Sequence, residues 1–312
     1  DFSTPSASHP MVHSITGNYT SPILEISVDR LAMVRYLTKD KNRKNKGVMA
    51  DHTSERMTIA GGEIEVLRGG SGPALVFLHG AGGAHNWMPY MDRLAEHYSL
   101  YVPSHPGWGR SDTPDWLDGI GDLAYFYLEF LDAIGEDEVH LVGNSFGGWV
   151  ALEISVRSTA LIKSLTLVSA AGIHVAGVPK GDIFLWDDDE RVYNTFFDPK
   201  LAEARLAREP SEEDRDIALK NHFSTAKLSW HPRFYNPELQ KWLHRIDVPT
   251  LILWGDSDKV FPPEYGVEMQ KLIPGSELTI IPECGHLPQQ EKINEFIAGV
   301  TEHTAQFEKG AA

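Results

Sequence analysis

The sequence predicts an α/β fold in which a mostly parallel sheet is flanked by helices. Apolar segments recur along the chain, at 74–79, 99–103, 138–142, 163–169, 248–254 and 277–282. They show little polar alternation, which is typical of strands buried on both faces of a sheet. Helical sequence separates them, and an alternation of strands with helices favours a parallel sheet with helices on both faces.

Two further strands are expected ahead of these six. Met57–Ile59 and Glu63–Leu67 alternate between apolar and polar residues, with two glycines between them. This pattern predicts an antiparallel hairpin at one side of the sheet. The predicted sheet therefore has eight strands.

The chain divides into three parts. Residues 1–55 are predicted to be an N-terminal extension, and 56–171 together with 246–312 form the core. Leu24–Leu37 has apolar residues at helical spacing, so we expect a helix that packs on the core or on a second subunit. Lys39–Lys46 is a basic run that we interpret as a solvated linker, with contact to an anionic surface as the alternative.

Residues 172–245 interrupt the alternation of strands and helices, and we refer to them as the insertion. A connection of this length inside a compact domain must have structure of its own. Ser211 begins a sequence that resembles a capping box, and Asn236 precedes a proline; both patterns predict helix starts. The insertion is therefore expected to be helical.

The segment Gly143–Gly147 fits the pattern G-x-S-x-G. An apolar segment at 139–142 leads into it, and helical sequence at 148–154 follows it. In this context the pattern predicts a sharp strand-to-helix turn that presents the Ser145 hydroxyl above the sheet edge, at the positive end of a helix. Ser145 is therefore the candidate nucleophile, and a chance match in a glycine-rich loop is the alternative.

A serine nucleophile needs a base that takes its proton and a carboxylate that orients the base. His286 follows the last predicted strand and is the candidate base. The loop after the strand at 248–254 contains Asp256 and Asp258. We prefer Asp258 as the acid because it lies beyond the turn glycine, and Asp256 is the alternative.

An oxyanion hole is also expected, because the tetrahedral intermediate of acyl transfer carries negative charge on oxygen. One donor would be the backbone N–H of Phe146, directly after the nucleophile. The other should come from the glycine-rich loop His79–Gly83, where the N–H of Ala81 is preferred and that of Gly82 is the alternative. This loop lacks the Gly-Lys-Ser/Thr ending of a phosphate-binding loop.

These motifs together resemble those of the α/β-hydrolase superfamily. The resemblance extends roughly from Met57 to Thr301 and rests on His79–Gly82, Gly143–Gly148, Trp254–Asp258 and Gly285–His286. It implies an α/β-hydrolase fold in which the insertion is a helical cap over the active site. In the Gly-x-x-Asp pattern of that family the acid is the fourth residue, which favours Asp258.

The resemblance also implies a class of reaction. A serine at position 145 excludes the dehalogenases and epoxide hydrolases of this fold, whose nucleophile is Asp. The elbow resembles that of carbon–carbon bond hydrolases acting on ring-fission diketones, but those usually have Trp after the catalytic His, where this chain has Leu287. We therefore expect a serine hydrolase of esters or lactones. A carbon–carbon bond hydrolase and a non-catalytic ligand receptor are the alternatives.

The aromatic residues of the expected cap indicate a small to mid-sized apolar substrate. Candidate pocket residues are Phe184 and Trp186 in the insertion, Trp149 after the elbow, and Leu287 beside the base. For the aromatic residues, packing in the interior is the preferred interpretation, and a place in the pocket is the alternative.

Composition limits the possible partners and cofactors. The net charge of −16 argues against nucleic-acid binding, and no apolar run is long enough to span a membrane. The single cysteine, Cys284, is expected to be a small buried residue. No metal-binding spacing and no cofactor motif is found. We expect a monomer or homodimer located in the cytoplasm; because the chain begins at Asp1, export is the alternative.

Overall fold

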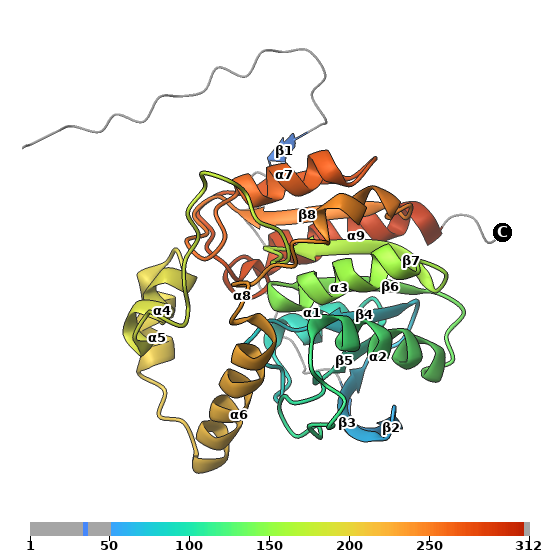
Figure 1. Cartoon of the computed structure of the whole chain (residues 1–312), viewed down its shortest axis with the longest axis horizontal. Helices are drawn as coiled ribbons and strands as arrows, with labels where there is room; N and C mark the ends of the chain where they lie inside the picture. The colour runs from blue at the N-terminus through green and yellow to red at the C-terminus, as the bar shows by residue number, and fades with distance from the viewer. Residues whose placement is uncertain (1–33, 37–50, 309–312) are drawn as a thin grey trace, which may run out of the picture. The chain divides into compact units, whose positions relative to one another are not determined.

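The computed structural model describes residues 34–36 and 51–308, and within them the strands form a single mixed sheet (Figure 1). Its strands are β1 (Val34–Tyr36), β2 (His52–Ile59), β3 (Gly62–Gly69), β4 (Ala74–Leu78), β5 (Ser99–Pro103), β6 (Val139–Asn144), β7 (Ile162–Val168), β8 (Thr250–Gly255) and β9 (Glu277–Ile281). The order across the sheet is β1-β9-β8-β7-β6-β4-β5-β3-β2. Strands β4 to β9 run parallel, and β2 and β3 form the antiparallel hairpin that the sequence predicted. The mostly parallel sheet and its eight predicted strands, β2 to β9, are thus confirmed.

A ninth strand corrects one prediction about the N-terminal extension. Val34–Tyr36, the end of the segment expected to be helical, is a strand that pairs in parallel with β9. The free edge of β9 supplies backbone partners, and pairing with it overrides a local helical pattern. The remainder of Leu24–Leu37 and the basic run Lys39–Lys46 lie outside the described residues.

Helices cover both faces of the sheet (Figure 1). They are α1 (Pro89–Ala95), α2 (Ile120–Ala133), α3 (Phe146–Arg157), α7 (Glu264–Leu272), α8 (Pro288–Glu291) and α9 (Ile293–Glu308). Successive residues of β4 point to opposite faces: Val76 packs in the apolar cluster with α2, α3 and α7, and Phe77 in the cluster with α1 and α9. Among residues 34–36 and 51–308, no helix has the length and apolar character needed to cross a membrane.

The order of strands determines where a site can form. From β4 the chain passes to β5 on one side and then returns to β6 on the other side of β4. Loops that leave the carboxyl ends of β4 and β6 therefore diverge, and ligands of open parallel sheets bind at such a switch point. The candidate oxyanion loop follows β4 and Ser145 follows β6, so the fold brings both to this point.

The insertion between β7 and β8 is helical, in agreement with the sequence. It contains α4 (Asp188–Thr195), α5 (Pro199–Leu206), α6 (Glu212–Ser229) and the 3-10 helix η1 (Gln240–Arg245). Ser211 caps α6 with a capping box, as predicted. The predicted helix start at Asn236 is wrong: the Asn236 side chain accepts from the Glu238 N–H in a turn, and η1 begins only at Gln240.

Candidate active site

Ser145 lies at a strained turn between β6 and α3. Its backbone has φ of 53° and ψ of −115°, a conformation that is unfavourable for a residue with a side chain. Three backbone hydrogen bonds hold it: the Ser145 N–H donates to the Val168 carbonyl at 2.9 Å, and the Ser145 carbonyl accepts from Trp149 at 3.1 Å and Ala171 at 3.0 Å. The neighbouring strand and the following helix thus maintain the turn that the sequence predicted.

The glycines around Ser145 are required by close approach of backbones. A Cβ at Gly147 would lie 2.2 Å from the Leu78 carbonyl oxygen, and a Cβ at Gly143 would lie 2.5 Å from the Gly147 carbonyl oxygen. Neither distance is compatible with a side chain. The G-x-S-x-G pattern therefore reflects the packing of α3 against the ends of β4 and β6.

His286 and Asp258 complete a hydrogen-bonded series with Ser145. His286 Nδ1 lies 2.8 Å from Asp258 Oδ2, and His286 Nε2 lies 2.9 Å from Ser145 Oγ. A carboxylate can only accept, so Nδ1 carries the proton and the neutral Nε2 is left to accept from the serine hydroxyl. All three residues are buried, with 7% of Ser145, 3% of Asp258 and 6% of His286 exposed.

The two competing aspartates have different partners. Oδ1 of Asp258 accepts from the N–H groups of Val260 at 2.8 Å and Phe261 at 3.0 Å, which leaves Oδ2 directed at His286. Asp256 instead accepts from its neighbour Ser257 and from the Cys284 N–H. The structure therefore brings Asp258, the preferred candidate, to His286.

Cys284 is fully buried two residues before His286. Burial raises the pKa of its thiol far above its usual range. Since the thiolate is the reactive form of cysteine, this environment favours an inert packing role. Within residues 51–308, no group of three or more His, Cys, Asp or Glu side chains is arranged to hold a metal ion.

Two buried histidines fix the base of the glycine-rich loop. His79 Nδ1–H donates to the Gly80 carbonyl at 2.7 Å, and its Nε2 accepts from the His105 N–H at 3.0 Å. His105 Nε2–H donates to the His79 carbonyl at 2.9 Å, and its Nδ1 accepts from the Tyr127 hydroxyl. Burial lowers the pKa of His79 to about 4 and that of His105 well below its usual value. Both rings are therefore neutral at pH 7.

The loop after β4 presents the candidate oxyanion donors beside Ser145. A Cβ on Gly80 would lie 3.3 Å from Ser145 Cβ, so this loop touches the nucleophile. The Gly83 N–H closes a turn on the Gly80 carbonyl at 3.0 Å. Among the described residues, the N–H groups of Ala81 and Gly82 donate to no protein acceptor, so both candidates remain available. Phe146 is the first residue of α3, where a backbone N–H has no acceptor within its own helix.

Sequence reasoning missed Glu291, at the end of α8. Its Oε2 accepts from the Gly285 N–H at 2.7 Å, and its Oε1 accepts from the N–H groups of Phe197 at 2.8 Å and Asp198 at 2.7 Å. The carboxylate thus joins the loop that carries His286 to the segment between α4 and α5. The partners lie up to 94 positions apart in sequence, and no local pattern signals such a contact.

The four predicted pocket residues are dispersed around the site. Phe184 stacks on Phe234 with ring centroids 5.3 Å apart. Phe234 in turn contacts the ring of Phe261, and Phe261 contacts the imidazole of His286. Leu287 is half-buried beside His286.

The other two have packing contacts. Trp186 is half-buried and packs beside Gly181. Trp149 is buried, and its indole N–H donates to Glu153 at 3.1 Å. These contacts are those of an interior residue. A role for Trp149 in a substrate pocket stays a prediction.

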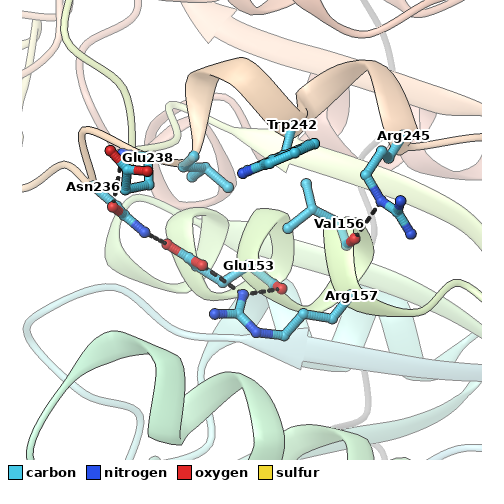
Figure 2. Close-up of a pocket in the computed structure, with 8 residues that line it drawn as sticks. Glu153, Val156, Arg157, Asn236, Glu238, Trp242 and Arg245 are labelled. Atoms are coloured by element: carbon cyan, nitrogen blue, oxygen red, sulfur yellow. Dashed lines mark hydrogen bonds and ion pairs between the residues drawn. The ribbon is translucent and has the colours of Figure 1, made fainter.

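A surface cleft of about 350 Å³ lies beside the second half of α3 (Figure 2). Its lining residues are Glu153, Val156, Arg157, Asn236, Glu238, Leu239, Trp242 and Arg245, which include none of the predicted pocket residues. Glu153 lies about 12 Å along α3 from the elbow, at 1.5 Å per residue. The Glu153 carboxylate pairs with Arg157 of the same helix at 2.6 Å and accepts from Asn236 of the insertion at 2.8 Å. Glu153 thus serves to join α3 to the insertion.

Comparison with known proteins gives one family match. A family model described as the alpha/beta hydrolase fold matches residues 73–293, which is more than half of the chain. The match includes the loop after β4, the elbow and His286.

The relatives include lipases and hydrolases of 2-hydroxy-6-oxo dienoic acids. The chain is 28% identical over 268 residues to Lipase 1 of Psychrobacter immobilis, covering 79% of this chain and 82% of that protein. It is 30% identical over 266 residues to 2-hydroxy-6-oxo-6-(2'-aminophenyl)hexa-2,4-dienoic acid hydrolase of Metapseudomonas resinovorans, covering 78% and 88%. A solved bacterial membrane phospholipase A superposes with a TM-score of 0.65 at 27% identity, covering 83% of this chain and 87% of that one.

Proposed function

The chain belongs to the α/β-hydrolase family, and on that premise we propose that it is a serine hydrolase acting on a carboxylic ester or lactone of a small to mid-sized apolar molecule. The observation that carries the proposal is the buried series from Asp258 through His286 to Ser145, with contacts of 2.8 and 2.9 Å. A hydroxyl, a neutral imidazole nitrogen and a carboxylate in this arrangement are what acyl transfer to serine requires.

In the first half of the proposed reaction, Ser145 Oγ attacks the substrate carbonyl carbon while His286 Nε2 takes the hydroxyl proton. Negative charge develops on the carbonyl oxygen, and the N–H groups of Phe146 and Ala81, or alternatively Gly82, would donate to it. His286 then returns its proton to the leaving alkoxide, and an acyl-enzyme remains on Ser145.

In the second half, water attacks the acyl-enzyme. His286 takes a proton from the water, and the tetrahedral intermediate again places its oxyanion near the same donors. Collapse of this intermediate breaks the ester bond to Ser145, whose oxygen recovers the proton from His286, and releases the carboxylic acid. Asp258 holds the imidazole in the required tautomer and stabilises the imidazolium that forms in each half.

Cleavage of a carbon–carbon bond in a ring-fission diketone is the second candidate. It is favoured by the relative from Metapseudomonas resinovorans, whose identity and coverage are similar to those of the lipase. Against it, His286 is followed by Leu287 and Pro288 rather than by Trp. We therefore rank ester hydrolysis first.

The proposal is tested by comparing two substrate classes on wild type and Ser145→Ala. We expect p-nitrophenyl esters from acetate to decanoate to be hydrolysed with a chain-length optimum, and Ser145→Ala to reduce this turnover to background without a change in the thermal midpoint. Turnover of a 2-hydroxy-6-oxo-dienoate without turnover of any ester would replace the proposal with the second candidate. Ester hydrolysis that survives Ser145→Ala would overturn the mechanism.

A further inference from the structure

Helix α6 of the insertion presents a row of buried polar residues to the loops around Ser145. Asn221, Ser224 and Thr225 are 2%, 8% and 2% exposed, and their spacing places them on one face of the helix. A helix that only covered a site would be expected to bury apolar side chains there. The partners of these three residues indicate a different role.

Asn221 joins two loops that follow neighbouring strands. Its Nδ2 donates to the Gly82 carbonyl at 2.9 Å, and its Oδ1 accepts from the Gly109 N–H at 2.9 Å. The first partner belongs to the loop that presents the oxyanion donors, and the second to the loop after β5. A Cβ on Gly83 would lie 2.4 Å from Asn221 Nδ2, so the loop approaches the side chain closely.

A second contact fixes the peptide plane that carries one candidate donor. The Ala81 carbonyl accepts from Trp108 Nε1 at 3.0 Å and from Thr225 Oγ1 at 3.3 Å. In a trans peptide the carbonyl and the following N–H point in opposite directions. Holding the Ala81 carbonyl toward α6 therefore directs the Gly82 N–H away from α6.

Hydrogen bonds also hold the other two peptide planes of this loop. The Gly80 carbonyl is bound by His79 and by the Gly83 N–H, which sets the direction of the Ala81 N–H. With Asn221 on the Gly82 carbonyl, all three peptide planes between Gly80 and Gly83 are determined by hydrogen bonds. Two of these planes depend on side chains from α6, more than 130 positions away.

We propose that Asn221, supported by Thr225, is a positioning residue for the oxyanion hole, so that α6 supplies part of the catalytic geometry. This inference rests on the proposed function. Asn221 touches no reacting atom in the proposed mechanism. It acts by holding the loop whose N–H groups must meet the developing oxyanion, and such donors are effective only when they are oriented in advance.

The test is Asn221→Asp, which keeps the size of the side chain and the acceptor for Gly109 but turns the donor to Gly82 into an acceptor. We expect kcat on the best p-nitrophenyl ester to fall about 10- to 100-fold. This fall is smaller than, or comparable to, the fall in kcat that follows removal of one oxyanion donor. KM should change less than about threefold. The affinity for a trifluoromethyl ketone, which forms a tetrahedral adduct with serine, should fall by about the same factor as kcat.

Three comparisons separate positioning from a purely structural role. Ser224→Ala removes a hydrogen bond from α6 to the Gly107 carbonyl, which belongs to the loop after β5 and not to the oxyanion loop. It leaves the bonds of Trp108 and Asn221 in place and should lower the thermal midpoint with little effect on kcat. Asn294→Asp makes the same chemical change on an exposed residue and should alter neither. Thr225→Val removes only the bond to the Ala81 carbonyl and should lower kcat several-fold. If Asn221→Asp does not fold, this variant decides whether α6 positions the oxyanion loop.

An unchanged kcat in folded Asn221→Asp, or a loss that Ser224→Ala reproduces at an equal loss of thermal stability, would overturn the inference and leave the proposed function standing. If Asn221→Asp does not fold, an unchanged kcat in Thr225→Val would likewise overturn the inference and leave the proposed function standing. A wild-type protein that neither hydrolyses any substrate nor reacts with a fluorophosphonate would remove the proposed function and this inference with it.

Discussion

Replacing Asp258 by Asn should trap His286 in the wrong tautomer. Oδ1 of Asp258 accepts from two backbone N–H groups, those of Val260 and Phe261, while Oδ2 faces His286 Nδ1. An asparagine can enter this position in two orientations. If its NH2 group faced the two N–H groups, three donors would meet without an acceptor, at a cost of about 1–3 kcal/mol for each buried unpaired group.

The structure therefore selects the other orientation, with the Asn oxygen on the two N–H groups and its NH2 on His286. The imidazole must then accept at Nδ1 and carry its proton on Nε2, where it can no longer take the Ser145 proton. A wrong tautomer of this kind lowers kcat by about 10⁴-fold in a serine protease, which corresponds to about 5 kcal/mol of transition-state stabilisation. We expect a loss of that order here.

The assay is kcat/KM on the best p-nitrophenyl ester, together with the thermal midpoint. Asp256→Asn is the matched control, because Asp256 accepts from Ser257 and Cys284 and does not contact His286. It should keep activity within a few-fold of wild type. An Asp258→Asn variant that retains more than about a tenth of wild-type activity, or an equal loss in Asp256→Asn, would show that Asp258 does not set the tautomer of His286.

Two other perturbations have defined outcomes. Glu291→Gln replaces a carboxylate that accepts three backbone N–H groups by an amide with one acceptor. We expect kcat to fall about tenfold and the thermal midpoint to drop by a few degrees. The exposed Glu302→Gln should change neither, and equal behaviour of the two variants would argue against a role for Glu291 in joining the two segments. His79 has a pKa of about 4 in the folded protein, against 6.5 for the ordinary side chain. Between these two values the unfolded state binds a proton that the folded state does not. The free energy of unfolding should therefore fall as the pH drops from 6.5 toward 4, by about 3 kcal/mol from this residue. Urea unfolding at pH 7 and 5 should show about 2 kcal/mol of this loss. A His79→Gln variant with the same slope as wild type would contradict the assignment.

The sequence was sufficient where a feature depends on neighbouring residues. The strands β4 to β9 were predicted within a few residues because each is a short, continuous apolar segment with a helix or the insertion after it. Ser145 could be proposed because its strand, glycines and helix are contiguous. His286 and Asp258 could be proposed because each follows a predicted strand.

The sequence was insufficient where a contact joins distant segments. Asn221 and Glu291 have no local motif, and the role of each depends on at least one partner more than 90 positions away. Val34–Tyr36 pairs with β9 although its own neighbourhood has a helical pattern. In these cases tertiary hydrogen bonding decides the outcome, and local propensity gives only a weak indication of it.

In the proposed mechanism, His286 and Asp258 make the Ser145 hydroxyl a nucleophile. The most direct measurement is the intact mass of the protein, with peptide mapping, after reaction with a fluorophosphonate. We expect one phosphonyl group per chain, located on Ser145. It should form at a rate that falls by orders of magnitude in Asp258→Asn, and it should be absent in Ser145→Ala. A wild-type protein that stays unlabelled, or carries the group on another residue, would contradict it.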